Sequence, residues 1–431
     1  MGSRWALIRS QPSAAATISL MAQIKVEVDP VDVGLGADRL DRIGAHFRQY
    51  VDDGRLPGWL VAVSRRGQVA YLDTYGRRDL EADLPVEADT VFRLYSMTKP
   101  VTTVAAMMLY EEGHFKLTDE VASFIPAFSG QRVYRSGSAQ NARTEPVRDP
   151  MRIWHLMTHT AGLTYGFLHA HPVDAMYRTA GFEWGSPPDH DLEASVNAWA
   201  AQPLLFQPGA EWNYSVATDV LGRLVEVISG QTLDEFFRTR IFEPLGMVDT
   251  AFWADTARQP RLAALYVPNP TDGTAKRFDT FGNNALDRPM TLSGGGGLVS
   301  TAHDYQRFIT MLLNRGELDG VRLLGPRTVR YMASNHLPGG AELSSFGRPL
   351  FSETDFDGMG FGLGFSVVID NAATKVLSSE GEFAWGGAAS TAFWVDPKEE
   401  ITALFLTQLL PSSTHPIRPE LKQLVYQAIE D

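Results

Sequence analysis

Residues 93–100 read RLYSMTKP and lead into the apolar run 101–110, and this stretch decides the fold and the chemistry. Ser96 and Lys99 are three residues apart at a predicted helix start, so their side chains lie one turn apart on the same face. Burial can lower the pKa of a lysine until its amine accepts a proton from a serine hydroxyl. Amide groups at a helix N-terminus add positive potential where an alkoxide would develop. Serine and lysine are common, so a lone Ser-x-x-Lys is also an ordinary helix start, and the catalytic interpretation needs partners elsewhere in the chain.

Composition narrows the possible functions. The chain has 431 residues, with 38 basic against 51 acidic side chains and a net charge of −13. This balance and the lack of a basic run argue against nucleic-acid binding, and no apolar run approaches the length of a membrane span. The absence of cysteine excludes disulfides, a thiol nucleophile and a thiolate metal site. We therefore expect a globular protein whose partner is a small molecule.

The first 30 residues are predicted to form a poorly ordered leader. A weakly apolar stretch at 14–22 follows two arginines, but Gln-Pro-Ser at 11–13 interrupts it and its apolar part is short. A leader without defined structure, or a start at Met21, is therefore favoured over a signal peptide. This interpretation predicts a cytoplasmic location.

Strand signals lie at both ends of the chain and helix signals in the middle. The predicted strands are 59–64, 69–74, 364–370, 375–378, 391–395 and 401–408. The predicted helices are 38–51, 152–157, 192–201, 215–229, 233–241, 300–313 and 421–428. These signals predict an α+β fold, in which an antiparallel sheet formed from both chain ends is flanked by helices and carries an inserted, mostly helical domain. The expected division is an α/β domain of 31–126 and 290–431 and an inserted domain of 127–289, with the active site in the cleft between them.

A second motif is FQPGAEWNYS at 206–215, in which an aromatic pair precedes a helix start. A tyrosine phenol close to a lysine ammonium can have its pKa lowered and can shuttle a proton, which makes Tyr214 a candidate catalytic residue. The alternative is a core tyrosine with its hydroxyl hydrogen-bonded.

A third motif is AWGGAAS at 384–390, which opens a predicted strand. The adjacent Gly386 and Gly387 allow a substrate to approach the backbone closely, and an edge strand offers a free N–H group for an oxyanion hole. The alternative is a β-bulge or a turn.

Other catalytic motifs are missing or incomplete. No G-x-S-x-G and no H-E-x-x-H sequence occurs, and the four glycines at 294–297 lack the Lys-Ser/Thr of a phosphate-binding loop. These glycines indicate a closely packed backbone near a cleft. His155 and His159 are four residues apart, but helix-end packing and backbone hydrogen bonds are favoured over metal binding. We expect neither a metal nor an organic cofactor.

Taken in order, the three motifs resemble those of the serine β-lactamase and penicillin-binding-protein superfamily, specifically its class C-like esterase branch, the family VIII carboxylesterases. The resemblance spans residues 36 to 430. It is carried by SMTK at 96–99, YSV at 214–216, WGG at 385–387, and the flanking stretches 155–163, 206–209 and 296–301.

The chain departs from the lactamase pattern at two positions. Val216 stands where the second motif usually has asparagine, and Trp385 stands where true lactamases have the lysine of Lys-Thr-Gly. That lysine helps to hold the substrate carboxylate, and an indole offers no positive charge. The expected substrate-binding residues are Trp385, Gly386, Gly387 and Val216, and the expected substrates are neutral esters, with weak β-lactam hydrolysis as a side activity.

The resemblance implies a two-step acyl transfer that hydrolyses short- to medium-chain esters. Ser96 attacks the ester carbonyl while Lys99, Tyr214 or both together take its proton, and the backbone N–H groups of Ser96 and Ala388 form the oxyanion hole. Three alternatives stay open: a β-lactamase or peptidase, an acyltransferase with the same catalytic residues, and a non-catalytic penicillin-binding-protein-like binding protein. The oligomeric state is not predicted.

Overall fold

The computed structural model describes residues 23–431, so most of the predicted leader lies outside the described residues. Within 23–431, the first residues lie against the sheet: Ile24 is buried, and the Glu27 amide donates to the Val69 carbonyl at 2.8 Å. Across this same part of the chain, none of the helices combines the length and the apolar character that a membrane crossing needs. The cytoplasmic location stays a prediction.

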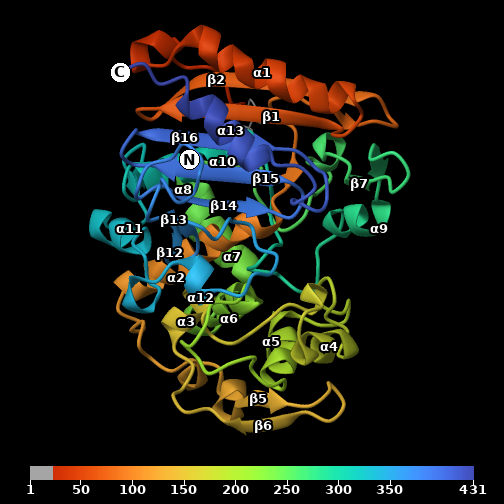
Figure 1. The fold of residues 1–431 in the computed structure, drawn as a ribbon, viewed down its shortest axis with the longest axis vertical. Coiled ribbons are helices and arrows are strands. Elements are labelled where there is room, and N and C mark those ends of the chain that lie inside the picture. The colour runs from red at the N-terminus through yellow and green to blue at the C-terminus, as the bar shows by residue number, and fades with distance from the viewer. Residues whose placement is uncertain (1–22) are drawn as a thin grey trace, which may run out of the picture.

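A large antiparallel sheet joins the two ends of the chain (Figure 1). Its eight strands run in the order β12-β13-β14-β15-β16-β1-β2-β3. The N-terminal strand β1 (Gly58–Arg65) pairs with β16 (Ile401–Leu406), with Val61 opposite Phe405. The other strands of this sheet are β2 (Gln68–Asp79), β3 (Leu84–Pro85), β12 (Met359–Phe361), β13 (Ser366–Val368), β14 (Phe383–Gly387) and β15 (Thr391–Asp396). The predicted α+β class and the pairing of both chain ends are confirmed.

Helices cover both faces of the sheet, which explains why the central strands carry apolar side chains on both sides. Every residue of β1 is buried. On one face, α1 (Ala37–Asp52) and α13 (Ile417–Tyr426) pack against alternate strand residues such as Phe405. On the other face, α2 (Thr98–Glu111) and α10 (Ala302–Leu313) pack against the residues in between.

The middle of the chain is mostly helical and lies beside the sheet (Figure 1). Its helices are α3 (Ile153–Met157), α4 (Pro172–Thr179), α5 (Leu192–Ala200), α6 (Ala217–Ser229), α7 (Leu233–Phe237), α8 (Glu243–Leu245) and α9 (Asp279–Gly282). It also contains two hairpins, β5 (Arg132–Ser136) with β6 (Arg143–Pro146) and β7 (Tyr266–Pro268) with β8 (Ala275–Arg277). Tyr266 donates its amide to the Gln408 carbonyl at 2.9 Å, so this part of the chain returns to the sheet. The domain boundaries at 127 and 289 stay a prediction.

The remaining elements are short. They comprise β4 (Phe92–Arg93), β9 (Val299–Ser300), β10 (Glu317–Leu318), β11 (Val321–Arg322), α11 (Pro326–Met332) and α12 (Leu343–Phe346).

Two strand predictions near the C-terminus need correction. Residues 375–378 form no strand: Lys375 has a φ of +58° and Leu377 is exposed, so two apolar side chains stand in a polar surface turn. The Trp-Gly-Gly stretch does not open the strand at 391–395; it belongs to β14, and residues 388–390 form the turn into β15. Glycines disfavour strands locally, and here the pairing with neighbouring strands outweighs that preference.

Replacing Trp59 by alanine tests the layer between the sheet and α1. Trp59 is fully buried, stacks on Phe405 at 6.5 Å between ring centroids, and donates from its indole nitrogen to the Phe47 carbonyl at 3.0 Å. We expect Trp59→Ala to lower the free energy of unfolding by about 3–5 kcal/mol in denaturant titrations. The control Leu377→Ala removes a side chain that is 52% exposed and should cost under about 0.5 kcal/mol. Equal losses in the two variants would contradict this assignment of the core.

Candidate active site

Ser96 lies in a single turn of 3-10 helix, η2 (Tyr95–Met97), directly before α2. Tyr95 has a φ of +47°, a left-handed conformation that costs a non-glycine residue about 1–3 kcal/mol. Hydrogen bonds on both sides stabilise the turn: the Leu94 amide donates to the Leu298 carbonyl at 2.9 Å, and the Tyr305 hydroxyl donates to the Met97 carbonyl at 2.9 Å. The turn leaves Ser96 partly exposed.

Lys99 lies in the first turn of α2 and reaches back to Ser96, as the spacing predicted. Its Nζ atom is 3.2 Å from Ser96 Oγ and donates to the Gly295 carbonyl at 2.7 Å. The side chain is almost completely buried, and this burial lowers the pKa of Lys99 to about 8. The carboxylates of Asp219 and Glu353 oppose the shift without cancelling it. A neutral amine is therefore accessible close to physiological pH.

Tyr214 contacts the same serine oxygen from the other side. Its hydroxyl donates to Ser96 Oγ at 2.5 Å, and its ring centroid lies 4.6 Å from Lys99 Nζ. The expected direction of its pKa shift is wrong: burial raises the pKa of Tyr214 well above its usual value, and the negative charge of Glu353 adds to this. The ammonium of Lys99 does not compensate, so Tyr214 is a neutral phenol in the resting enzyme.

The third motif lies beside the serine because β14 packs against η2. A β-carbon on Gly387 would collide with the Leu94 carbonyl oxygen, so the close approach requires glycine at this position. Ala388 follows in the turn after β14, and its role in the oxyanion hole stays a prediction. The ring of Trp385 lies 5.5 Å from that of Tyr214. The structure therefore brings together all three sequence motifs.

Two of the expected substrate-binding side chains are buried. Trp385 is 1% exposed, and its indole nitrogen has no hydrogen-bond partner among residues 23–431. Val216 is 4% exposed and lies directly before α6. Both side chains belong to the same buried hydrophobic cluster as Tyr214.

An arginine that the sequence did not single out reaches the same strand. Gly386 leaves room for the Arg418 guanidinium, which a β-carbon at that position would overlap. Arg418 forms an ion pair with the buried carboxylate of Glu353 and donates to the Glu353 carbonyl at 2.6 Å. The cation beside β14 is therefore already neutralised. No local motif identifies either residue, because they are 65 positions apart.

Asp219 links the tetraglycine stretch to Lys99. Its Oδ1 atom accepts from the Ser293 hydroxyl at 2.5 Å and from the Gly295 amide at 3.0 Å. The carbonyl of the same Gly295 accepts from Lys99, and Thr102 donates to the Gly294 carbonyl at 2.7 Å. The glycines form closely packed backbone, as expected, and the carboxylate that orders them escaped the sequence analysis.

The two histidines of the sequence analysis have structural partners. His155 Nδ1 accepts from the Arg152 amide at 3.0 Å, and His159 Nδ1 lies 3.1 Å from the Ser215 hydroxyl. Burial lowers the pKa of His155 to about 4 and that of His159 well below its usual value. In residues 23–431, no group of three or more His, Asp or Glu side chains is arranged to hold a metal ion.

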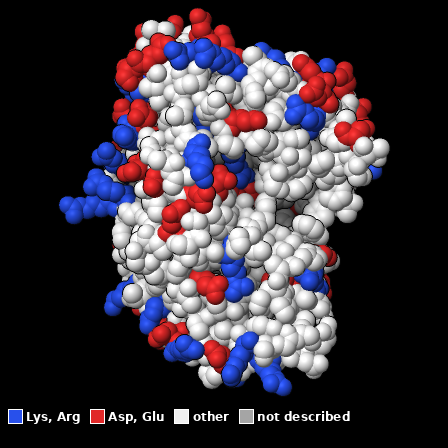
Figure 2. Space-filling model, in the orientation of Figure 1, with Lys and Arg blue, Asp and Glu red and all other residues white. Residues whose placement is uncertain are grey.

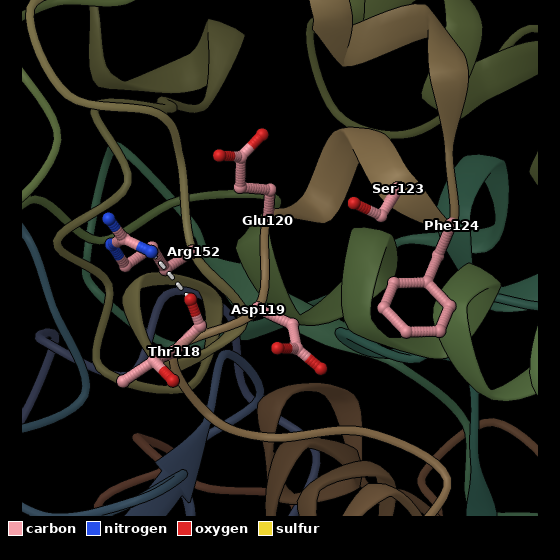
Figure 3. Close-up of a pocket in the computed structure, with 6 residues that line it drawn as sticks. All are labelled: Thr118, Asp119, Glu120, Ser123, Phe124 and Arg152. Atoms are coloured by element: carbon pink, nitrogen blue, oxygen red, sulfur yellow. Dashed lines mark hydrogen bonds between the residues drawn. The ribbon is translucent and has the colours of Figure 1, made fainter.

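A pocket elsewhere on the molecule is not the candidate site (Figure 3). It is lined by Thr118, Asp119, Glu120, Ser123, Phe124 and Arg152. Arg152 donates to the Thr118 carbonyl at 2.6 Å, and Asp119 accepts from the Lys116 amide at 2.8 Å. The charged side chains of Arg152 and Asp119 therefore form hydrogen bonds with nearby backbone groups.

Comparisons with known proteins agree with this geometry. Residues 43–427 match the family model described as Beta-lactamase. Protein Rv1367c of Mycobacterium tuberculosis is 38% identical over 86% of this chain and 90% of its own length. Esterase EstB of Burkholderia gladioli is 31% identical over 93% of this chain and 98% of its own length. The solved structure of EstCE1, described as a hydrolase with promiscuous acyltransferase activity, superposes with a TM-score of 0.76 at 28% identity, covering 91% of this chain and 99% of EstCE1.

The pH dependence of Ser96 acylation tests the link from Asp219 to Lys99. A neutral Lys99 amine acting as the base predicts that the rate with p-nitrophenyl acetate rises about tenfold per pH unit below 8 and levels off above it. Asp219→Asn keeps an oxygen for the Gly295 amide but removes the charge that raises the pKa of Lys99. We expect the rising limb of the pH profile to move to lower pH.

Ser293→Ala is the matched control, because it removes a hydrogen bond to Asp219 and keeps the charge. Its rising limb should stay in place. A profile that is identical in wild type and Asp219→Asn would contradict the electrostatic link.

Proposed function

Since this chain belongs to the beta-lactamase family, we propose that it is a serine carboxylesterase that hydrolyses short- to medium-chain esters through an acyl-enzyme on Ser96. The observation that carries the proposal is the double contact of Ser96 Oγ, with Lys99 Nζ at 3.2 Å and the Tyr214 hydroxyl at 2.5 Å. A serine that only begins a helix does not require contacts from a buried amine and a buried phenol to its hydroxyl oxygen.

The pKa directions support Lys99 as the first base. Burial lowers the pKa of Lys99 and raises that of Tyr214, which favours the neutral amine of Lys99 over the phenol as the group that takes the Ser96 proton. Ser96 Oγ then attacks the ester carbonyl carbon, and the carbonyl oxygen becomes an oxyanion. The amides of Ser96 and Ala388 donate to this oxygen, and each such donor typically contributes about 3 kcal/mol of transition-state stabilisation.

Tyr214 completes the acylation step. Its neutral phenol donates a proton to the leaving alcohol oxygen as the carbon–oxygen bond breaks, and the Lys99 ammonium replaces that proton. A water molecule then attacks the acyl carbon while the neutral Lys99 amine takes up its proton, directly or by relay through the Tyr214 hydroxyl. Collapse of the second tetrahedral intermediate releases the acid, and Ser96 Oγ regains its proton.

The surroundings of β14 favour neutral esters. Trp385 occupies the position of the lactamase lysine, and the Arg418 guanidinium is already paired with Glu353. A substrate carboxylate therefore gains no free cation at this strand, because binding it to Arg418 would first require breaking the ion pair with Glu353. Weak β-lactam hydrolysis is a side activity in this account.

Acyl transfer to an alcohol is the second candidate, because the similar EstCE1 is described as having promiscuous acyltransferase activity. The acyl-enzyme is common to both reactions, and only the acceptor differs. Measuring the partition of p-nitrophenyl butyrate between butyric acid and methyl butyrate in dilute methanol separates them. A purely binding function is disfavoured, because the catalytic contacts are all present.

Replacing Ser96 tests the nucleophile. We expect Ser96→Ala to lower the rate of p-nitrophenyl butyrate hydrolysis by at least roughly 10⁴-fold, because no other group can form the acyl-enzyme. A circular dichroism melt should show the fold unchanged. Turnover at the wild-type rate by the folded variant would refute the assignment.

Replacing Glu353 tests the preference for neutral substrates. Wild-type kcat/KM for p-nitrophenyl butyrate should exceed that for nitrocefin by at least about 100-fold, an interval of about 2.7 kcal/mol. Glu353→Gln removes the buried charge and frees Arg418 to meet a carboxylate, so the ratio should fall. A ratio that rises or stays constant in this variant would contradict the proposed role of the ion pair.

A further inference from the structure

Four aromatic rings lead from the catalytic residues toward solvent. This aromatic row consists of Tyr165, Phe167, Trp184 and Phe281. It begins at Tyr165, whose ring centroid lies 5.2 Å from that of Tyr214 and 5.5 Å from Lys99 Nζ. The row is therefore continuous with the reaction centre.

Each ring of the row touches the next. Tyr165 stacks on Phe167 at 4.7 Å between centroids, and Phe167 stacks on Trp184 at 5.6 Å with only 6° between the ring planes. Trp184 meets Phe281 edge to face at 6.1 Å. Phe281 belongs to α9, and the other three rings come from the chain around α4, so the contact bridges segments about one hundred residues apart.

The outer end of the row is open to solvent. Trp184 is 63% exposed. Figure 2 shows the surface hollowed between the region that carries α9 and the region that carries α4, with a largely uncharged rim on this face. Exposed aromatic surface that continues into a catalytic cleft is typical of a ligand site.

The row carries no charge of its own. Burial raises the pKa of Tyr165 well above its usual value, which keeps this phenol neutral. Beside the outer part of the row, Glu183 lies 3.2 Å from His169, and Asp279 forms an ion pair with Arg277 at 2.6 Å. An ionic ligand gains little along the outer part of the row, and an apolar one gains contact with ring edges and with the exposed part of Trp184.

We propose that the aromatic row binds the larger apolar half of the ester and that this half is a flat ring system. The inference rests on the proposed esterase function and names its substrate class. Nearly parallel rings offer flat faces and edges that match another ring, and a rigid ring loses little conformational entropy when it binds, whereas a flexible chain loses much more.

The test compares wild type with Trp184→Ala on three esters: ethyl acetate, 2-naphthyl acetate and ethyl 2-naphthoate. The two naphthalene esters place the ring on the alcohol side and on the acyl side, respectively. For at least one of them, Trp184→Ala should raise KM about tenfold and change kcat less than twofold, because it removes one stacking partner. The kinetics with ethyl acetate should stay unchanged.

Two further variants separate recognition from structure. Trp184→Phe keeps a stacking ring and should recover most of the affinity. Tyr331→Ala removes an aromatic side chain of α11 that is 47% exposed and meets His336 edge to face, and it should leave the kinetics with all three esters unchanged.

If, for each of the three esters, KM is the same in Trp184→Ala as in wild type, the inference is overturned and the esterase function stays intact. If wild type instead hydrolyses none of the esters faster than Ser96→Ala does, the proposed function fails, and the aromatic row as an ester subsite fails with it.

Discussion

The burial of the Lys99 amine beside Ser96 is the interaction on which the rest of the site depends. An ammonium ion that leaves water loses solvation, and this loss lowers the pKa of Lys99 to about 8. The Gly295 carbonyl accepts a hydrogen bond from Lys99, and the carboxylates of Asp219 and Glu353 stabilise its ammonium form, which offsets part of the fall in pKa. The balance leaves a lysine that can release and accept a proton near neutral pH. A fully compensated lysine would remain charged and could not act as a base.

The fold supplies this environment from three distant parts of the chain. The pairing of β1 with β16 joins the two chain ends and places β14 beside the turn that carries Ser96. The start of α6 contributes both Tyr214, just before the helix, and Asp219, in its first turn. Because α6 packs on α2, one helix–helix contact brings the Tyr214 hydroxyl to Ser96 and the Asp219 carboxylate to the tetraglycine stretch at 294–297.

Local patterns predicted much of this arrangement. The helical spacing of Ser96 and Lys99 and the apolar periodicity of the helices are properties of neighbouring residues, so the sequence reveals them. The two glycines of β14 favour a turn locally, so the sequence pattern does not reveal this strand. Residues 375–378 have the local propensity of a strand, but propensity does not depend on burial, and the segment is a surface turn. The pKa of Tyr214 was predicted in the wrong direction, since desolvation depends on the whole fold. Glu353 and Arg418 meet only in three dimensions.

The most direct measurement of the central claim is the intact mass of the protein after incubation with a fluorophosphonate, followed by peptide mapping of the adduct. A neutral Lys99 and a neutral Tyr214 on one oxygen predict a single adduct, located on Ser96. An adduct on a different serine, or no adduct at all, would show that Ser96 is not activated. The residues 96–99 would then be an ordinary helix start, and the account of the site would be wrong.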